Sequence, residues 1–551
     1  MLINTIVSNY KPQVKELEDC KCKNKDNPCN CTKEECSYNI LEQPNYLEDL
    51  DLNLDYSIDF SLHLIDTTDF TKNMRNYDLE QIIKKLEKIE IIGENPTKHW
   101  EKNKTMCKLE IINPDITIKT PNFKYGNWEQ EEFNMHINQL LNLGVIQKSN
   151  SRHRTPAFIV QKEAEKKRGQ SRMVFDYRRL NDNTFEDGYC IPDKDTLINK
   201  IQGKNWFSKF DLKSGFWQVK MHKESIEWTA FSCPLGYFEW LVMPFGLKNA
   251  PQIFQRMMDD IFKDCYNFTC VYIDDILVFS GSEKEHIQHL YIIFSLFEKH
   301  GLIISKKKME IGKNYISFLG AEIGNGTIKL QPHISRKILE FPDKLEELKQ
   351  LQSFLGLVNY VRPYFKNLSK LTSPLYNKAQ QKGVRNFNDQ DIKVVQQLKE
   401  EIKKLEPLAL PLESDYLIIE TDGCELGWGG ILIKKPNEFS SKSLEKICRY
   451  TSGVFKEKGY LTSLDYEILS IIYVLEKFAL FILSKKQITI RTDCESIVKF
   501  ADTKNERKLT SNRWLKFREF VLNRGFKIKW EHIKGKDNKI PDLLSRKLLY
   551  N

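Results

Sequence analysis

The sequence predicts an α+β fold followed by a second, compact α/β domain. The first observation is an irregular alternation of strand-like and helix-like segments from about residue 121 to residue 379. The second observation is a linker around Pro407 and Pro411, after which strand and helix patterns begin again. A chain of 551 residues is long enough for several domains, and a hydrophobic content of 41% is enough to build their cores.

Composition narrows the class of protein. The formal net charge of +9 weakly favours a polyanionic partner. No apolar run approaches 18 residues, and no apolar segment follows Met1, so the sequence predicts a protein that is neither secreted nor bound to a membrane. In such a chain the thirteen cysteines are expected to be free thiols.

Residues 1–115 are polar and are predicted to form a partly disordered N-terminal extension, with one helix at Gln81–Ile92. The extension is cysteine-rich over Cys20–Cys36. Five cysteines lie there, namely Cys20, Cys22, Cys29, Cys31 and Cys36. Their spacing departs from the C-x2-4-C pattern that is usual for zinc, and no nearby histidine completes a site. The spacing therefore disfavours zinc.

The first domain begins with a helix and a hairpin. Phe133, Ile137 and Leu140 follow helical spacing within Trp128–Leu143, and Gly144 suits the end of that helix. Strands are predicted at Ala157–Gln161 and Met173–Tyr177, with the basic turn Lys162–Arg168 between them.

The remaining elements of both domains follow in order. In the first domain we expect a strand at Phe207–Asp211 and helices at Gln252–Phe262, Glu283–His300, Leu345–Tyr364, Leu371–Ala379 and Asp391–Leu405. In the second we expect strands at Tyr416–Thr421, Gly430–Lys434 and Gln487–Thr492, and helices at Ser463–Leu483 and Leu509–Arg524.

Two neighbouring carboxylates interrupt the apolar stretch VYIDDILVF at Val271–Phe279. Successive strand residues face opposite sides, so Asp274 and Asp275 can share a site only at a turn. The stretch therefore predicts a β-hairpin with the two carboxylates at its tip. With Asp211 at another strand end, they form a candidate site for two Mg²⁺ ions, which prefer carboxylates and substrate phosphates.

The second domain contains four more carboxylates at the ends of predicted elements: Asp422, Glu467, Asp493 and Asp542. Each one alone is typical of a helix cap or a turn. Together, they can converge on two Mg²⁺ ions that activate water to cut a phosphodiester.

Five motifs of the first domain occur in one order. They are SRMVFDYRRLN, FDLKSGFWQV, MPFGLKNAPQIFQ, YIDDILVFS and FLGAEI. As an ordered set they resemble the reverse transcriptase domain over Asn122–Ala379. The resemblance implies a right-hand polymerase, with fingers and palm at 116–335 and a thumb at 336–380. A short linker or connection helix at 381–413 would follow.

The same resemblance implies a role for individual residues. Asp211, Asp274 and Asp275 would be the catalytic, metal-binding triad. The residues implied in nucleotide binding are Lys162, Arg172, Phe216, Tyr272 and Phe245. Lys162 and Arg172 would grip the incoming triphosphate, although Lys166, Lys167 and Arg168 lie on the same turn. Phe216 would exclude a ribose 2′-hydroxyl and Tyr272 would contact the primer end. Phe245 stands where retroviral enzymes carry a glutamine, which implies a more apolar pocket, and FLGAEI would be the primer grip.

The second carboxylate set resembles ribonuclease H over residues 414–551. By that resemblance, Asp422, Glu467, Asp493 and Asp542 are the catalytic and metal-binding carboxylates. His532 would assist product release or proton transfer; a hydrogen-bonded surface histidine is the alternative interpretation.

The combination of a reverse transcriptase-like domain with a ribonuclease H-like domain resembles the polymerases of plant pararetroviruses (Caulimoviridae, badnavirus or tungrovirus type). Gypsy-like LTR retrotransposons are the close alternative. It implies a processed polyprotein product that copies RNA and DNA templates with dNTPs, degrades RNA in RNA–DNA hybrids and replicates a viral genome. Each active site would use two Mg²⁺ ions, for which Mn²⁺ could substitute. The expected location is the host cytoplasm or the virus capsid. A non-catalytic binding subunit and an RNA-copying RNA polymerase are the rival functions, and a monomer and a dimer both remain open.

Overall fold

The computed structural model of the chain describes residues 76–161, 171–366, 368–380, 386–455, 461–502, 517, 519–521 and 525–545. All of them belong to the unit Thr71–Asn551. The cysteines of Cys20–Cys36 and the turn Lys162–Arg168 lie outside the described residues, as does most of the predicted helix Leu509–Arg524.

Part of the predicted N-terminal extension packs against the palm. It contains the helix α3 (Asn76–Lys88), the short turn η1 (Trp100–Lys102) and the strand β1 (Met106–Cys107), which pairs with β6 (Lys220–Met221). Leu86, Ile91 and Ile92 are buried in the core that the palm helices share. The sequence predicted partial disorder up to residue 115, whereas from Asn76 onward the described chain is ordered against the palm.

The region predicted as the fingers is built on a five-stranded sheet with the order β2-β8-β7-β3-β4. Its strands are β2 (Ile146–Lys148), β3 (Thr155–Val160), β4 (Arg172–Phe175), β7 (Phe231–Cys233) and β8 (Gly236–Trp240), and its helices are α4 (Asn127–Asn142), α6 (Arg178–Asp182) and α8 (Lys223–Ile226). The apolar stripe of α4 is buried at Phe133, Ile137 and Leu140, because helical spacing places these side chains on one face. The predicted helix and the paired strands β3 and β4 are confirmed.

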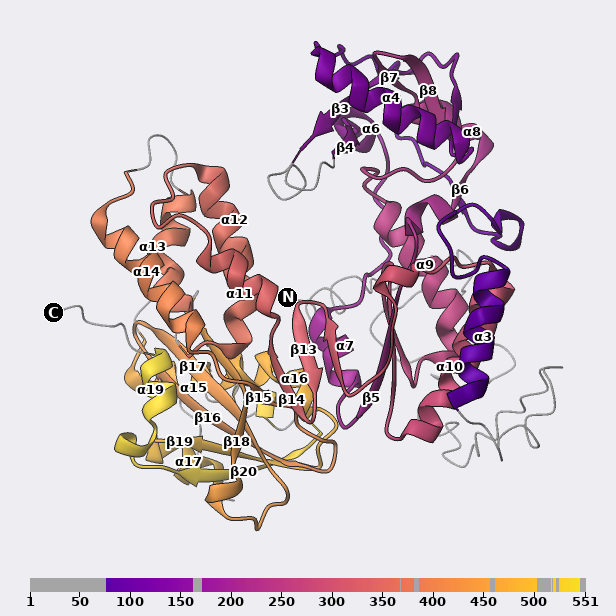
Figure 1. Cartoon of the computed structure of the whole chain (residues 1–551). Coiled ribbons are helices and arrows are strands. Elements are labelled where there is room, and N and C mark those ends of the chain that lie inside the picture. Colours follow the sequence, from indigo (N-terminus) through magenta and orange to yellow (C-terminus); the bar gives the residue numbers. More distant parts are fainter. Residues whose placement is uncertain are drawn as a thin grey trace, which may run out of the picture. The chain divides into compact units, whose positions relative to one another are not determined.

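The palm sheet has the order β11-β5-β10-β9. Its strands are β5 (Trp206–Asp211), β9 (Thr269–Tyr272), β10 (Asp275–Ser280) and β11 (Glu310–Lys313), and its helices are α7 (Lys194–Lys200), α9 (Ala250–Phe262) and α10 (Glu283–His300). Figure 1 shows α9 and α10 beside these strands. Alternate residues enter different cores: Phe210 and Ile276 join the core of these helices, whereas Phe207 and Leu277 join the core of the thumb. Both faces of the palm sheet are therefore packed against other elements.

A second small sheet follows the palm. It consists of β12 (Tyr315–Phe318), β13 (Ala321–Gly324), β14 (Thr327–Leu330) and β15 (Leu408–Ala409). The thumb helices are α11 (Pro332–Leu339), α12 (Leu348–Val358), α13 (Leu368–Gln380) and α14 (Asp389–Lys403). The linker predicted around Pro407 contributes strand β15, which pairs with β14.

The second domain is a five-stranded sheet with the order β18-β17-β16-β19-β20. Its strands are β16 (Tyr416–Cys424), β17 (Gly427–Lys435), β18 (Lys446–Gly453), β19 (Gln487–Thr492) and β20 (Lys527–His532), and its helices are α15 (Ser463–Lys477), α16 (Ala479–Ile482), α17 (Glu495–Asp502) and α19 (Lys539–Ser545).

The helices α15 and α19 lie on opposite faces of this sheet. A Cβ added at Gly429 would lie 2.2 Å from the Leu544 Cβ of α19, and one added at Gly430 would lie 2.6 Å from a Val474 methyl of α15. Neighbouring strand residues face opposite sides, so the two glycines let one helix approach each face. No helix among the described residues combines the length and the apolar character needed to cross a membrane.

Candidate active sites

The first carboxylate group lies at the tip of the hairpin formed by β9 and β10. Asp275 pairs directly with Asp211 across the two strands. Ile273 has a φ of 54°, and its N–H donates to Gln255 Oε1 of α9 at 2.7 Å. The tip is therefore turned tightly and tied to a helix, and the predicted hairpin with its carboxylates at the turn is confirmed.

Close approach of another loop completes this site. A Cβ added at Gly215 would lie 3.2 Å from the Asp274 Cβ and 3.0 Å from the Phe254 ring. A larger residue there would press on the hairpin tip and on the Phe254 ring. Gly215 begins the short turn η2 (Gly215–Gln218), which carries Phe216.

Two lysines neutralise the paired aspartates. Lys209 Nζ lies 2.9 Å from Asp275 Oδ1, and both side chains are largely covered. Lys308 Nζ donates to both oxygens of Asp211, at 2.8 and 2.9 Å. Like charges that face each other across two strands repel, so these ion pairs offset the repulsion between Asp211 and Asp275.

Asp274 carries the charge that is least compensated. Burial raises the pKa of its carboxyl group, and repulsion from Asp211 and Asp275 raises it further. A divalent cation beside these oxygens would remove the repulsion. Three carboxylates around one turn are thus a donor set that suits hard cations such as Mg²⁺.

A cleft of about 420 Å³ opens beside this group. Its lining residues are Lys209, Asp211, Asp275, Lys308, Glu310, Ser317, Leu319, Gly320, Gln331 and His333. Leu319 and Gly320 belong to the FLGAEI motif, and both have positive φ angles. The cleft therefore joins the carboxylates to the loop predicted as the primer grip.

Of the residues predicted to bind nucleotide, the structure brings two into ring contact. The ring centroids of Phe216 and Phe245 are 5.2 Å apart, and Phe245 is 51% exposed. Tyr272 ends β9 beside the hairpin tip, and Arg172 begins β4 as an exposed residue. Lys162 lies outside the described residues. Their roles in binding stay predictions.

The second carboxylate group converges more closely. Asp422 lies in β16, Glu467 in the first turns of α15 and Asp493 directly after β19. One oxygen from each of the three lies within 4.8 Å of the others, and within the described ranges they are the group that meets this test for a metal site. Asp542 of α19 is close enough to influence the Glu467 carboxyl group. His532 ends β20 and its Nε2 lies 3.2 Å from the Asp493 carbonyl oxygen.

Glu467 is the electrostatic centre of this second group. Burial raises the pKa of Glu467 to about 9, and repulsion from Asp422 and Asp493 contributes. Its Oε2 is buried and has no hydrogen-bond partner among the described residues. Burying a polar oxygen without a partner is costly, and a bound cation would satisfy it. The residues therefore fit a divalent metal.

Helices on both faces of the sheet position Asp422. Ser545 of α19 donates a hydrogen bond to Asp422 Oδ2. From the other face, Ser470 of α15 donates to the Asp422 carbonyl oxygen at 2.7 Å. Asn538, fully buried, donates to the neighbouring Thr421 carbonyl oxygen at 3.0 Å. These contacts restrict where Asp422 can move.

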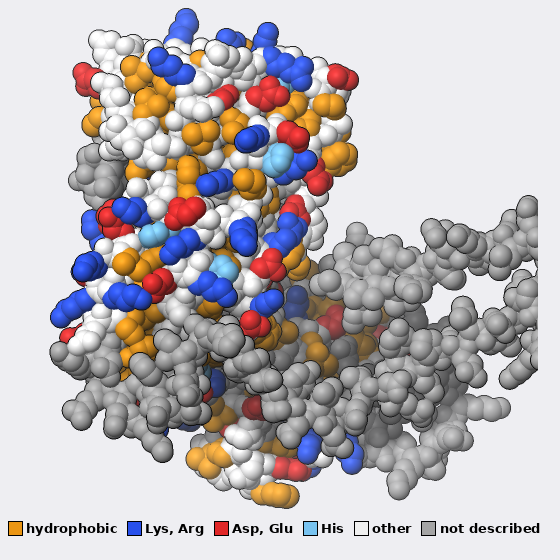
Figure 2. All heavy atoms as spheres, turned by 90° about the vertical axis from the view of Figure 1, so that its right-hand side faces the viewer, with side chains coloured by type: hydrophobic (Ala, Val, Ile, Leu, Met, Phe, Trp, Pro, Cys, Tyr) orange, Lys and Arg blue, Asp and Glu red, His pale blue; other side chains and the backbone are white. Residues whose placement is uncertain are grey.

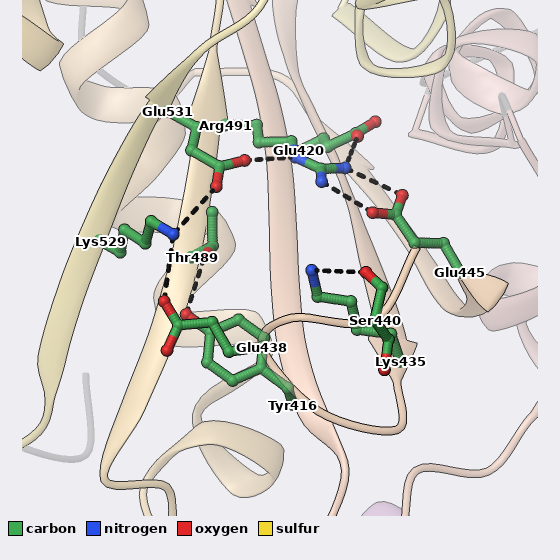
Figure 3. Close-up of polar contacts among 10 residues, drawn as sticks. All are labelled: Tyr416, Glu420, Lys435, Glu438, Ser440, Glu445, Thr489, Arg491, Lys529 and Glu531. Atoms are coloured by element: carbon green, nitrogen blue, oxygen red, sulfur yellow. Dashed lines mark hydrogen bonds and ion pairs between the residues drawn. The ribbon is translucent and has the colours of Figure 1, made fainter. Parts of the chain in front are cut away.

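An arginine lies next to the second carboxylate group, on the same face of the sheet. Arg491 pairs with Glu420 in the parallel register of β19 and β16, two residues before Asp493 and Asp422 respectively. Figure 3 shows its guanidinium group among Glu420, Glu445 and Glu531, with donor–acceptor distances between 2.7 and 3.0 Å. These hydrogen bonds raise the pKa of Arg491, so its charge is fixed beneath the carboxylates.

Sequence reasoning missed the residues that support both sites, namely Lys209, Lys308, Ser470, Arg491, Asn538 and Ser545. One signal was available: Lys209 and Arg491 each precede a strand-terminal aspartate by two residues, so each shares its face. No comparable signal marks Ser545, whose contact depends on how α19 packs.

Two family models match the chain. "Reverse transcriptase (RNA-dependent DNA polymerase)" matches residues 160–323, and "RNase H-like domain found in reverse transcriptase" matches residues 413–520. The chain is 42% identical over 482 residues to the enzymatic polyprotein of Cauliflower mosaic virus (strain Strasbourg), covering 87% of this chain and 69% of that protein. The chain belongs to the reverse transcriptase–ribonuclease H polymerases of plant pararetroviruses.

Other relatives agree with this family. Polyprotein P3 of Commelina yellow mottle virus is 44% identical over 511 residues, which are 91% of this chain but only 27% of that polyprotein. Among solved structures, the foamy viral protease-reverse transcriptase with dsDNA matches with a TM-score of 0.67 at 23% identity, over 85% of this chain and 97% of that one. The complex of that protein with an RNA/DNA hybrid matches with a TM-score of 0.65 at 24% identity, over 88% of this chain and 64% of that one.

These comparisons confirm the predicted family, the right-hand polymerase fold and the ribonuclease H-like domain that follows it. They favour the pararetrovirus interpretation over the retrotransposon. The predicted domain boundaries and the catalytic role of individual residues stay predictions.

Proposed function

We propose that this chain is a DNA polymerase that copies both RNA and DNA templates and hydrolyses the RNA strand of the hybrids it makes. The observation that carries the proposal is the presence of two separate carboxylate groups, one at paired strand ends and one whose oxygens lie within 4.8 Å of one another. A polymerase that copies RNA leaves an RNA–DNA hybrid, and the second site removes its RNA. The product of the first reaction is therefore the substrate of the second.

At the polymerase site, Asp211, Asp274 and Asp275 would hold two Mg²⁺ ions. Bound there, the ions supply deprotonation of the primer 3′-hydroxyl and neutralisation of the leaving pyrophosphate. The protein itself places the carboxylates at a fixed turn and offers the cleft beside them for the primer end. Holding the reacting groups in register is a large part of such catalysis.

At the nuclease site, Asp422, Glu467, Asp493 and Asp542 would hold the ions that activate water. Ser545 and Ser470 keep Asp422 in place from the two faces of the sheet. His532 lies at the rim on the Asp493 carbonyl, where it can exchange a proton with solvent or product.

The substrates proposed for the first site are dNTPs and a primed template. Phe216, whose ring contacts Phe245, would select dNTPs by excluding a 2′-hydroxyl, and Arg172 with Lys162 would bind the triphosphate. Figure 2 shows Lys and Arg side chains scattered over one face of the fingers and palm among acidic and hydrophobic ones, so that face presents no uniform basic patch. We place the primer end in the cleft instead.

The relatives are viral polyproteins, which supports a role in copying a viral genome through an RNA intermediate. By the same argument the chain would act in the host cytoplasm or in the capsid, with Mn²⁺ able to replace Mg²⁺.

The test is primer extension on RNA and on DNA templates, with cleavage of a labelled RNA template followed in the same tube. The proposal expects extension on both templates and shortening of the RNA. Extension without any RNA cleavage would contradict the second activity, and no extension on either template would contradict the first.

A further inference from the structure

Lys209 lies inside the polymerase site, although no catalytic motif of the sequence marks it. It precedes Asp211 by two residues in β5 and therefore shares its face of the sheet. Its Nζ lies 2.9 Å from Asp275 Oδ1, and only 20% of the side chain is exposed. Glu310 of β11 pairs with Lys209 from the other side, and all of these residues line the cleft.

The two lysines of the site are held very differently. The Lys308 side chain is 63% exposed, and it contacts both oxygens of Asp211. A cation that binds Asp211 competes with Lys308 for those oxygens, and an exposed lysine can swing into solvent at little cost. Lys209 extends from a central strand, is mostly covered, and contacts Asp275 through one oxygen. It can keep that contact while a cation occupies the site.

Asp275 needs such a contact because of its neighbour. It faces Asp211 directly across the two strands, and two carboxylates in that position repel each other. Without a cationic partner, the Asp275 side chain would turn away from Asp211 or reach for the metal in a different orientation. A fixed positive charge beside Asp275 prevents both.

We propose that Lys209 is a positioning residue for DNA synthesis, which holds Asp275 in its working orientation through a permanent ion pair. The inference rests on the polymerase function proposed above. It has two consequences of opposite sign. Loss of the ammonium group makes the site more negative, so divalent cations bind more tightly. Loss of the fixed orientation slows nucleotide transfer.

The experiment compares Lys209→Met, Lys209→Gln and Lys209→Arg in the full chain. Affinity is measured with Mn²⁺ alone by electron paramagnetic resonance, in chains that also carry Asp422→Asn and Glu467→Gln to weaken the second site. Rates of single-nucleotide addition are measured without those two changes. Hybrid cleavage by the same rate variants reports whether the second domain has folded, and far-ultraviolet circular dichroism reports on the fold of the whole chain.

For Lys209→Met and Lys209→Gln, Mn²⁺ binding should tighten by about threefold to tenfold. Their kcat should fall on the order of tenfold, because a displaced carboxylate no longer fits the transition state. The KM for dNTP should change by less than about twofold, since Arg172 and Lys162, the residues predicted to grip the triphosphate, are unchanged. Lys209→Arg keeps the charge and a donor, and should restore both the Mn²⁺ affinity and kcat.

A matched control is Lys434→Met in the second domain. The Lys434 side chain is 16% exposed and pairs with Asp415 at 2.8 Å, so it resembles Lys209 in burial and partner. This variant should change neither the Mn²⁺ affinity of the first site nor its kcat.

Any outcome in which Mn²⁺ binding fails to tighten overturns the inference. If Mn²⁺ affinity is unchanged and primer affinity falls, Lys209 binds the primer backbone instead. If kcat and Mn²⁺ affinity fall together, Lys209 only supports the fold. A wild-type chain that synthesises no DNA refutes the proposed function itself, whereas normal synthesis with unaffected Lys209 variants refutes this inference alone.

Discussion

The two carboxylate groups solve the same electrostatic problem in different ways. At the hairpin tip, Asp211 and Asp275 are each neutralised by a lysine. In the second domain, oxygens of Asp422, Glu467 and Asp493 converge within 4.8 Å, and the fixed arginine lies one step behind them. There the repulsion is relieved by keeping a proton on Glu467, whose pKa is raised to about 9.

The difference has a chemical consequence. A cation that enters the first site displaces a lysine, whereas a cation that enters the second site displaces a proton. The second exchange therefore depends on pH. We therefore expect the two proposed metal sites to respond differently to the same conditions.

The largest expected effect comes from removing divalent cations, which both groups need. Chelation with EDTA should lower both DNA synthesis and RNA hydrolysis by at least about a thousandfold, because metal ions supply several kcal/mol to each reaction. Adding Mg²⁺ in excess should restore both activities, and adding K⁺ at the same ionic strength should restore neither. An activity that survives chelation would show that the carboxylates of its site do not act through a divalent cation.

Loss of the arginine behind the second group should be the next largest effect. In Arg491→Met, three glutamates lose their shared partner, and leaving buried charges unpaired costs about 3–5 kcal/mol. Urea unfolding followed by tryptophan fluorescence and by loss of hybrid cleavage measures this free energy.

The control for this variant is Arg178→Met. Its ion pair with Asp176 leaves the Arg178 side chain 84% exposed, so the free energy of unfolding should fall much less than in Arg491→Met. Equal effects of the two changes would mean that the Arg491 network does not stabilise the second domain.

The two sites should also differ in their treatment of a 2′-hydroxyl: we expect the first to exclude it and the second to require it. Phe216→Ala should raise incorporation of ribonucleotides relative to dNTPs on the order of tenfold, because the ring no longer fills the space that the hydroxyl needs. Single-nucleotide addition with matched rNTP and dNTP measures the ratio. Phe439→Ala, which removes a ring that is 92% exposed, should leave it unchanged. Unaltered selectivity in Phe216→Ala would refute the assignment of the gate.

The smallest effect is a pH dependence confined to the second domain. Folded Glu467 keeps its proton up to a pKa of about 9, whereas the unfolded chain releases it near the ordinary value of 4.5. Between these values the folded state holds the extra proton, so the free energy of unfolding should fall by up to about 1.4 kcal/mol per pH unit as pH rises. Urea unfolding of the metal-free protein at pH 6, 7 and 8 tests this slope.

In Glu467→Gln the titrating group is gone, so the slope should flatten. Saturating Mg²⁺ should flatten it as well, because the cation stabilises the ionised carboxylate. A slope that is the same in wild type and in Glu467→Gln would show that another group titrates.

Much of both sites could be predicted from the sequence, since their carboxylates sit at the ends of recognisable elements. VYIDDILVF predicted its own hairpin, because alternation forbids two adjacent strand residues from sharing a site. The pairing of Lys209 with Asp275 could not be predicted, since it depends on the register between β5 and β10. Neither could the contact of Ser545 with Asp422, which joins residues 123 positions apart.

The elements that sequence reasoning missed have related causes. The segment 76–115 is polar along much of its length, and its few apolar residues become core only where they meet the palm. Strand β18 alternates buried and half-buried residues without a clear apolar run, and its place is set by pairing with β17. Contacts between segments that are far apart in the chain leave little trace in the local sequence pattern.

The most direct test of the two-site account is a pair of variants assayed for both activities. Asp274→Asn should abolish primer extension and leave cleavage of a preformed RNA–DNA hybrid intact, whereas Asp422→Asn should do the reverse. Far-ultraviolet circular dichroism checks that each variant is folded. Loss of both activities in either folded variant would contradict the account, because it would mean that the two carboxylate groups do not act as separate sites.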